Sequence, residues 1–310
     1  MAIQEADKIW HNGKLVPWKD ATIHVMTHGF LYGTSMFEGV RVYDTPHKGP
    51  CIFRNLAHTE RLMYSTKVYR IPMPYSVAEM MAAQRETVRA NGLKSAYIRV
   101  NAAAGYGELG PYAIPEHSDV SIIAFPFGKY LGAEAIEQGI DVCVSSWRRM
   151  APGTVPAGVK ASGNYLSSRL ITMEAKSRGC TEGIGLAHDG TVSEGAGENL
   201  FLVKDGRIIT PPAASSILGG ITRDTVMVFA EELGIEVVEQ ALPREMLYAA
   251  DELFFSGTAA EVTPIRNIDG LDVSKPGARP VTSAIQKKFF GLFSGETEDK
   301  WGWLDPVNAS

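Results

Sequence analysis

One lysine of this sequence stands in a setting that could make it a nucleophile. Lys160 follows a segment, 151–158, that is rich in proline, glycine and alanine, and it precedes an amphipathic stretch from Asn164 to about Arg178. A backbone with few bulky side chains can lie close to a flat ligand. A lysine amine in a desolvated pocket loses its proton more readily and can form a Schiff base with an aldehyde. On composition alone, a solvated surface lysine is the simpler interpretation.

Three further segments offer groups that such a lysine would need. The glycine turn Gly219–Thr222 opens an expected helix, where free N–H groups bind anions, although Thr222 could simply cap that helix. Glu194 lies between expected strands; if buried it needs a cationic partner such as a protonated pyridine nitrogen, and if exposed it is an ordinary turn carboxylate. The turn Gly257–Ala260 could bind a phosphate oxygen or a substrate carboxylate. Together with Lys160 these segments predict pyridoxal phosphate, a flat anionic aldehyde.

The composition is that of an ordinary globular protein and argues against several classes. The length of 310 residues suggests roughly two domains, and 45% of the residues are apolar. A net charge of −5 without a basic stripe argues against nucleic-acid binding. Cys51, Cys143 and Cys180 lack metal-site spacing and indicate a reducing compartment. Residues 1–8 lack the apolar core of a secretory signal, and no apolar run approaches the ~18 residues of a membrane span, so a cytoplasmic enzyme or binding protein is expected.

Turn signals and periodicity predict an α+β first part of the chain. The expected elements are a hairpin around Asn12-Gly13, a strand-like stretch over 22–29, helices over 55–70 and 76–91, and strands over 95–101 and 120–125. Asn55 is the expected N-cap of the first helix. His24 and His28 lie in the strand-like stretch without a metalloprotease glutamate, which argues against a helical metal site. Tyr97 and Arg99 should share one face of their strand.

The segment Gly105–Gly110 matches the pattern G-x-G-x-x-G, but the dinucleotide interpretation fails. Pro111 and Pro115 follow directly, so no helix N-terminus is available for a pyrophosphate. A flexible glycine loop is expected instead.

The best linker candidate divides the chain into two domains. We predict a smaller N-terminal α+β domain over 1–126, a linker over 127–135 and a larger cofactor-binding domain over 136–310. The elements expected in the larger domain are a strand over 139–145, a helix over 164–178, hairpins around Asp189-Gly190 and Asp205-Gly206, a helix that is opened by 218–224 and ends near Gly234, a strand that runs into a small-residue turn over 252–260, and a helix over 281–293.

Three separated blocks carry a resemblance that covers the chain from end to end. Lys160–Tyr165, Glu194–Phe201 and Gly220–Asp224 resemble the signature blocks of the class IV aminotransferases. The segments that narrow the resemblance to the bacterial branched-chain amino-acid aminotransferases are His24–Met26, Tyr32–Ser35, Phe37–Gly39, Tyr97–Arg99 and Glu296–Leu304. The resemblance implies a two-domain α+β enzyme of fold-type IV, similar to D-amino-acid aminotransferase, with the cofactor between the domains.

The resemblance also implies roles for single residues. Lys160 would carry the cofactor as a Schiff base, Tyr165 would bond the ring oxygen, Glu194 the pyridine nitrogen, and Leu218 would pack on the ring. The phosphate would be bound by Arg61, Ile221, Thr222 and Thr258. The substrate side chain would be enclosed by Tyr32, Phe37, Gly39, Phe127 and Tyr130. The substrate carboxylates would be bound by Tyr97 and Arg99 at the distal end and by Thr258 and Ala259 at the α end.

The reaction implied is a ping-pong transfer of the amino group between L-leucine, L-isoleucine or L-valine and 2-oxoglutarate, by a homodimer or a higher oligomer such as a hexamer. The loop 105–115 departs from the pattern of the best-known bacterial members. An (R)-selective amine transaminase or D-amino-acid aminotransferase of the same fold therefore stays as an alternative, and a non-catalytic binding protein is a second. For Arg99, the alternative is an arginine that is bonded only within its own sheet.

Overall fold

The computed structural model describes residues 3–113, 116–128, 130–273 and 279–308. It divides the chain into two compact units, one of Met1–Gly128, Val159–Gly163 and Phe293–Ser310 and one of Lys129–Gly158 and Asn164–Leu292. We predicted two domains that are each one continuous stretch of the chain. The two units of the structure are each made of separate stretches, because the segment that contains Lys160 and the C-terminal tail belong to the first unit.

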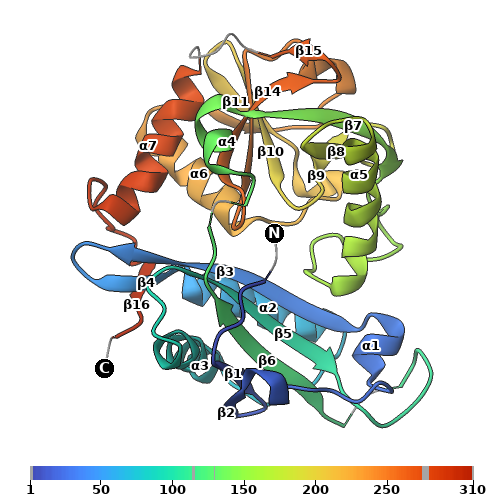
Figure 1. The fold of residues 1–310 in the computed structure, drawn as a ribbon. Coiled ribbons are helices and arrows are strands. Elements are labelled where there is room, and N and C mark those ends of the chain that lie inside the picture. Colours follow the sequence, from blue (N-terminus) through green and yellow to red (C-terminus); the bar gives the residue numbers. More distant parts are fainter. Residues whose placement is uncertain (1–2, 114–115, 129, 274–278, 309–310) are drawn as a thin grey trace. The chain divides into compact units, whose positions relative to one another are not determined.

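The first unit is built on one antiparallel sheet, which has seven strands in the described part of the chain, in the order β16-β4-β3-β5-β6-β1-β2. The strands are β1 (Lys8–His11), β2 (Lys14–Pro17), β3 (Ser35–Thr45), β4 (Gly49–Phe53), β5 (Ala96–Ala104), β6 (Ser118–Phe125) and β16 (Leu304–Pro306). The helical segments are η1 (Trp18–Asp20), α1 (His28–Tyr32), α2 (Asn55–Val68) and α3 (Val77–Ala90). Figure 1 shows α2 and α3 beside this sheet.

Buried and partly buried residues alternate along β5, so one face of this strand packs in the core of the first unit and the other face is more polar. Ile98, Val100 and Ala102 are buried in one cluster with Leu62 of α2 and Met80 of α3. The intervening residues of β5 are only partly buried, because successive side chains of a strand point to opposite faces. Residues 97, 99 and 101 therefore share the face of the sheet that this core leaves uncovered, as predicted for Tyr97 and Arg99.

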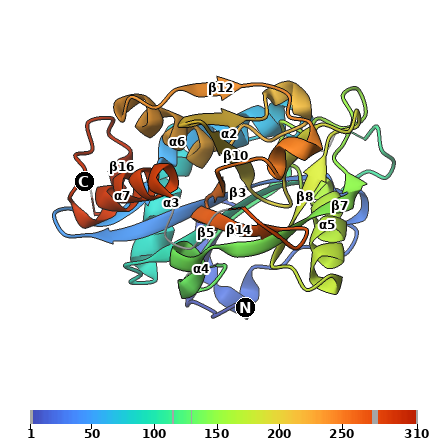
Figure 2. The ribbon, with the colours of Figure 1, turned by 90° about the horizontal axis from the view of Figure 1, so that it is seen from above.

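The second unit is built on a mixed sheet that has nine strands among the described residues, in the order β12-β11-β10-β13-β14-β7-β8-β9, with β15 paired to β14. The strands are β7 (Ile140–Arg148), β8 (Glu182–Leu186), β9 (Val192–Gly195), β10 (Asn199–Lys204), β11 (Arg207–Thr210), β12 (Val237–Glu239), β13 (Glu252–Gly257), β14 (Glu261–Ile268) and β15 (Leu271–Asp272). The helical segments that remain are α4 (Ala133–Gln138), η2 (Ser162–Asn164), α5 (Tyr165–Ser177), η3 (Ala213–Ser215), α6 (Ile221–Glu232), η4 (Arg244–Leu247) and α7 (Pro280–Ser294). Figure 2 shows α5 beside β7 and β8, near the end of the sheet opposite to β12.

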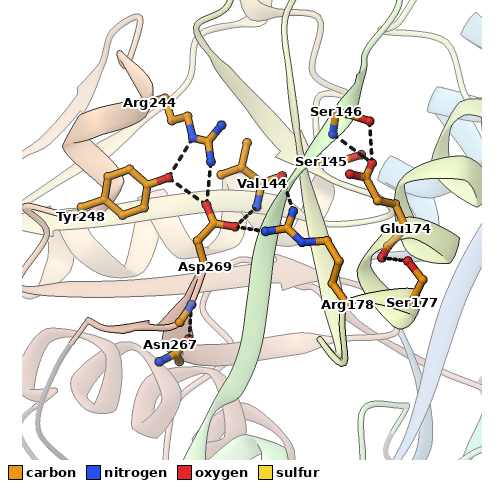
Figure 3. Close-up of polar contacts among 11 residues, drawn as sticks. Val144, Ser145, Ser146, Glu174, Ser177, Arg178, Arg244, Tyr248, Asn267 and Asp269 are labelled. Carbon is orange, nitrogen blue, oxygen red and sulfur yellow. Dashed lines mark hydrogen bonds and ion pairs between the residues drawn. The ribbon is translucent and has the colours of Figure 1, made fainter.

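A partly buried carboxylate ties several elements of the second unit together (Figure 3). Asp269, in the turn between β14 and β15, accepts hydrogen bonds from the backbone N–H of Val144 and from the side chains of Arg178, Arg244 and Tyr248. Burial alone would raise the pKa of Asp269, but these donors outweigh it and lower the pKa. The contacts fix strand β7, the end of α5 and the segment η4 against one another.

Most predicted elements are confirmed, and two local predictions are wrong. Hairpins join β1 to β2, β8 to β9 and β10 to β11 at the predicted turns. The stretch 22–29 is not a strand, since α1 begins within it. Asn55 is the first residue of α2 rather than its N-cap: Arg54 takes that place with φ 54°, and the Asn55 amide donates to Asp305 instead. Among the described residues, no helix is long and apolar enough to span a membrane.

Candidate active site

Lys160 is fixed alongside strand β3 of the first unit. Its carbonyl accepts the N–H of Phe37 at 3.0 Å, its N–H donates to Ser65 Oγ at 3.3 Å, and Ala161 forms a β-bridge with Met36. The Lys160 ammonium nitrogen lies 4.9 Å from the centroid of the Phe37 ring. Although Lys160 lies in a loop, its backbone is therefore held in place by strand β3 of the sheet.

A buried charged cluster lies on the same strand. Glu38 Oε1 and Oε2 accept from Arg61 Nε and Nη2 at 2.7 and 2.9 Å, and Oε2 also lies 2.7 Å from His58 Nδ1. The Glu38 and His58 side chains are 1% and 2% exposed, so water contributes little to their solvation. Burial would raise the pKa of Glu38, but Arg61 and His58 hold it well below its usual range, whereas burial lowers the pKa of His58. The paired contact fixes the plane of the Arg61 guanidinium.

Aromatic rings and one arginine occupy the polar face of β5 and its neighbour β3. The Arg99 guanidinium carbon lies 3.4 Å from the centroid of the Phe37 ring, and Arg99 Nε donates to Asn101 at 3.2 Å. Tyr97 packs against Phe127 with ring centroids 4.9 Å apart. Gly39 is opposite Arg99, and a Cβ there would stand 1.9 Å from the Tyr97 hydroxyl, so only glycine fits. The structure thus brings together five predicted substrate residues of the first unit, apart from Tyr32.

Tyr32 belongs to a second group, at the glycine loop. Its hydroxyl accepts the N–H of Gly110 at 3.3 Å, and its ring lies 4.5 Å from that of His28. His28 Nε2 lies 3.0 Å from the Gly110 carbonyl. The described residues directly after Gly110 form a turn and not a helix. Ile114 and Pro115, the end of the loop 105–115, lie outside the described residues.

In the second unit, Glu194 is a buried residue of β9 and not a surface turn carboxylate. Glu194 Oε1 accepts from Arg149 Nη2 at 2.6 Å, and Oε2 accepts from Asn199 Nδ2 at 2.9 Å and from the Leu218 N–H at 3.0 Å. Asn199 Nδ2 also donates to the Leu218 carbonyl at 2.8 Å. The two side chains therefore hold the backbone of Leu218 from both sides, just before helix α6.

The start of α6 offers backbone donors. Gly220 is its N-cap and supplies no side-chain hydrogen bond to the first turn, where Ile221 and Thr222 are buried. A Cβ on Gly220 would stand 1.8 Å from Asn199 Oδ1, so glycine is required for the close approach to Asn199. Ser216, at φ 62°, has a buried hydroxyl without a partner among the described residues. Free N–H groups at the start of a helix of this length bind anions.

The remaining predicted residues lie elsewhere in the second unit. Thr258 and Ala259 form the turn between β13 and β14, and both are partly buried. Tyr130 and Tyr165 line one cavity of about 450 Å³ together with residues of α5. The buried hydroxyl of Ser256, two residues before Thr258, has no partner within the described chain.

Four residues that organise these groups were not predicted. Glu38 and His58 orient Arg61, and Arg149 and Asn199 orient Glu194. Glu38 stands in a stretch that glycine turns alone would explain, and Arg149 precedes the small-residue segment with no distinctive spacing. No group of three His, Cys, Asp or Glu side chains that could hold a metal ion is found in the part of the chain that the structure describes.

The comparisons with known proteins agree with the three sequence blocks. The family model described as amino-transferase class IV matches residues 35–268. The branched-chain-amino-acid aminotransferase of Salmonella typhimurium is 57% identical over 310 residues, which cover 100% of both chains. The crystal structure of the Escherichia coli branched-chain amino acid aminotransferase is 57% identical, with a TM-score of 0.96, and covers 98% of this chain and 100% of that chain.

A more distant solved structure extends the likeness. The branched-chain amino acid aminotransferase of Thermobaculum terrenum, in its PLP-form (holo-form), is 33% identical with a TM-score of 0.91, and covers 98% of this chain and 99% of that chain. The two-domain α+β fold of fold-type IV is therefore shared at high and at low identity. The chain belongs to the class IV aminotransferases, and the protein is an aminotransferase.

Proposed function

We propose that the protein uses pyridoxal phosphate to transfer the amino group between L-leucine, L-isoleucine or L-valine and 2-oxoglutarate. The observation that carries the proposal is the position of the Phe37 ring, which has both the Lys160 amine and the Arg99 guanidinium within 5 Å of its centroid. An amine, an apolar ring and a cation in one place suit a substrate whose side chain is either apolar or carboxylate. The full-length similarity to branched-chain aminotransferases supports the same conclusion.

The residues present fit pyridoxal phosphate. The uncapped start of α6, with the hydroxyl of Thr222, suits a phosphate, and so does the oriented guanidinium of Arg61. The buried Glu194 carboxylate suits a protonated pyridine nitrogen, and the buried hydroxyls of Ser216 and Ser256 call for a polar partner. When bound, this cofactor supplies an electron sink for the Cα carbanion.

A role in binding the cofactor then follows for residues of both units. Lys160 would hold the cofactor through its aldehyde, and its amine would move the Cα proton as general base. Glu194 would keep a proton on the ring nitrogen. Tyr165 would donate to the ring oxygen, and the partly buried Leu218 would cover one face of the ring. The phosphate would be held by Arg61, Ile221, Thr222 and Thr258.

The substrate contacts follow from the same groups. Tyr97 and Arg99 bind the distal carboxylate of glutamate and 2-oxoglutarate, and the turn of Thr258 and Ala259 binds the α-carboxylate. The branched side chain is enclosed by Tyr32, Phe37, Gly39, Phe127 and Tyr130. A wholly apolar pocket would leave the distal carboxylate without partners, while the Phe37 ring keeps Arg99 favourably placed when leucine is bound.

A homo-oligomer, at least a dimer, is the proposed assembly. The segment 23–32 and the loop 105–112 of the first unit carry large exposed apolar side chains, and they touch each other through the His24 and Tyr106 rings, 4.9 Å apart. Val25 and Phe30 are each 69% exposed and Tyr112 is 88% exposed. Exposed apolar groups in one place favour burial against another chain. Light scattering that finds an active monomer at assay concentration would contradict this proposal.

Two experiments test the activity. Borohydride reduction in the presence of pyridoxal phosphate, followed by peptide mapping, should label Lys160, and a label at Lys204 instead would refute the assignment. The variant Lys160→Ala should lose transamination while keeping its fold. A substrate panel should show turnover with L-leucine and 2-oxoglutarate, whereas preference for D-alanine or (R)-1-phenylethylamine would support the alternative enzymes of this fold.

A further inference from the structure

Two of the three cysteines lie on neighbouring segments of the second unit. Cys143 is fully buried in strand β7, and Cys180 is partly buried in the turn between α5 and β8. The N–H of Thr181, which follows Cys180, donates to the Asp141 carbonyl at the beginning of β7 at 2.8 Å. The turn that carries Cys180 is thereby held against the strand that carries Cys143.

A second contact holds the turn from its other side. Arg178, two residues before Cys180, donates from Nη1 to the carbonyl of Val144, which follows Cys143, at 2.9 Å. Asp269 strengthens this contact because it accepts from Arg178 Nη2 at 2.8 Å and from the Val144 N–H at 3.1 Å (Figure 3). Both cysteines are thus flanked by residues whose positions are fixed relative to each other.

The two thiols are close enough to influence each other electrostatically. Burial raises the pKa of the Cys143 thiol to about 12, and the neighbouring Cys180 thiol adds to this rise. The positive charge of Arg178 by itself would lower the pKa of Cys143. Cys143 therefore stays a thiol at neutral pH. Cys180 is the more accessible of the two thiols, because it is only partly buried, so it is the one that a peroxide reaches first. No residue of the proposed active site takes part in this pair.

We propose that Cys143 and Cys180 form an intramolecular disulfide when the protein meets a hydroperoxide. The Cys180 sulfur attacks one peroxide oxygen, the O–O bond breaks, and a sulfenic acid and one water are formed. The Cys143 sulfur then attacks the Cys180 sulfur, gives up its proton and releases a second water. Overall the two thiols lose two electrons and two protons, and hydrogen peroxide is reduced to two waters.

The disulfide would close a ring over residues 143–180, which contains Lys160 and the whole of α5. Cross-linking a chain reduces the conformational freedom of its unfolded state more than that of its folded state. Oxidation should therefore raise the Tm of the protein, and dithiothreitol should reverse the change. A thiol that gains only oxygen atoms would not produce this stabilisation.

The experiment exposes the purified holoenzyme to hydrogen peroxide and then measures its mass and its thiols after denaturation. The mass should fall by two hydrogens, and the titratable thiols should fall from three to one, because the sequence has three cysteines and two are consumed. Peptide mapping without reduction should join the peptide of Cys143 to that of Cys180. Three remaining thiols, or oxygen adducts at Cys180 without a cross-link, would overturn the proposal.

Matched variants separate the pair from the third cysteine. Cys51→Ser lacks the buried cysteine of the first unit and should still lose two thiols with the same mass change. Cys180→Ser changes a partly exposed position and should form no cross-link and show no rise in Tm. If Cys143→Ser folds, dimedone should trap a sulfenic acid at Cys180. A cross-link that involves Cys51 in the wild-type protein would contradict the assignment.

Discussion

Each unit of the molecule buries one carboxylate beside residues of the proposed chemistry, but the two carboxylates are satisfied in different ways. Glu38 is held by two cationic or polar side chains of one helix, Arg61 and His58 of α2. Glu194 is held by one arginine, one amide and the N–H of Leu218, which come from three separate segments.

The difference separates a structural charge from a functional one. Glu38 forms a compact ion pair, so its main effect is to neutralise and orient Arg61. Glu194 is linked through Asn199 and Leu218 to the segment that leads into α6, so its position is coupled to the proposed phosphate and ring contacts. Both neutral replacements leave an arginine without its buried partner and should cost stability, but only the replacement at Glu194 should also slow the proton transfer itself.

The largest effect is expected for Glu194→Gln. The amide keeps the shape and can still be bonded, so the fold should survive with reduced stability because Arg149 loses its charged partner. The amide no longer holds a proton on the ring nitrogen. Proton transfer should slow by about 10²–10⁴-fold, the range typical of a lost acid–base contribution. Single-turnover kinetics with L-leucine measure the step, and Glu231→Gln, an exposed position on α6, is the control. An unchanged rate would mean that Glu194 only supports Leu218.

Glu38→Gln should act first on the fold. Removing one partner of a buried ion pair typically costs about 3–5 kcal/mol, because the other charge stays buried without compensation. The loss should appear in denaturant unfolding, with Glu60→Gln, an exposed position next to Arg61, as the control.

The same variant tests the orientation of Arg61. If Glu38 positions that guanidinium for a phosphate, Glu38→Gln should weaken the affinity of the apoenzyme for pyridoxal phosphate and leave its affinity for pyridoxal nearly unchanged. Equal losses for both ligands would show that the cluster serves stability alone.

Arg99→Ala should separate the two half-reactions. Removing one partner of a desolvated charge pair costs about 2–5 kcal/mol, so the half-reaction with 2-oxoglutarate should be impaired by that amount and the leucine half-reaction much less. The stacking of Arg99 on Phe37 also predicts a small change in leucine binding. Arg89→Ala, exposed on α3, is the control. Equal losses in both halves would mean that Arg99 serves the sheet, through its bond to Asn101.

The sequence predicts best where a local signal suffices. Asn-Gly and Asp-Gly turns place three hairpins, because each of these signals depends only on neighbours in the chain. The stretch 22–29 fails because its alternation is not matched by a strand partner. Arg54 takes the N-cap of α2 because the Asn55 side chain is bonded to Asp305, far away in the sequence.

Local sequence signals also reveal only part of the candidate site. Lys160, Glu194 and the α6 turn could be found because they stand in recognisable blocks. Glu38, His58 and Arg149 could not, since what makes them important is burial beside a partner 20 or more residues away. The assignment of Val159–Gly163 to the first unit likewise follows from a bridge to β3 that no local pattern encodes.

The smallest effect concerns pH. His58 has a lowered pKa in the folded protein because it is buried, so between that pKa and the ordinary value of 6.5 the unfolded chain binds more protons than the folded one. Stability therefore falls as the pH falls through this range, and a single such group removes at most about 1.4 kcal/mol between roughly pH 7.5 and 5.5. The lowered pKa of Glu38 has the same sign and adds a further loss below its ordinary value of 4.5. Because both groups lie in the first unit, the hydrogen-exchange protection factors, which correct for the slower intrinsic exchange at acid pH, should fall in α2 more than in α5. His58→Asn keeps a donor for Glu38 without a titrating ring, so it should remove the dependence above about pH 5.5. The same slope in this variant would assign the effect to another group and would leave the buried pair of the first unit without a role in acid sensitivity.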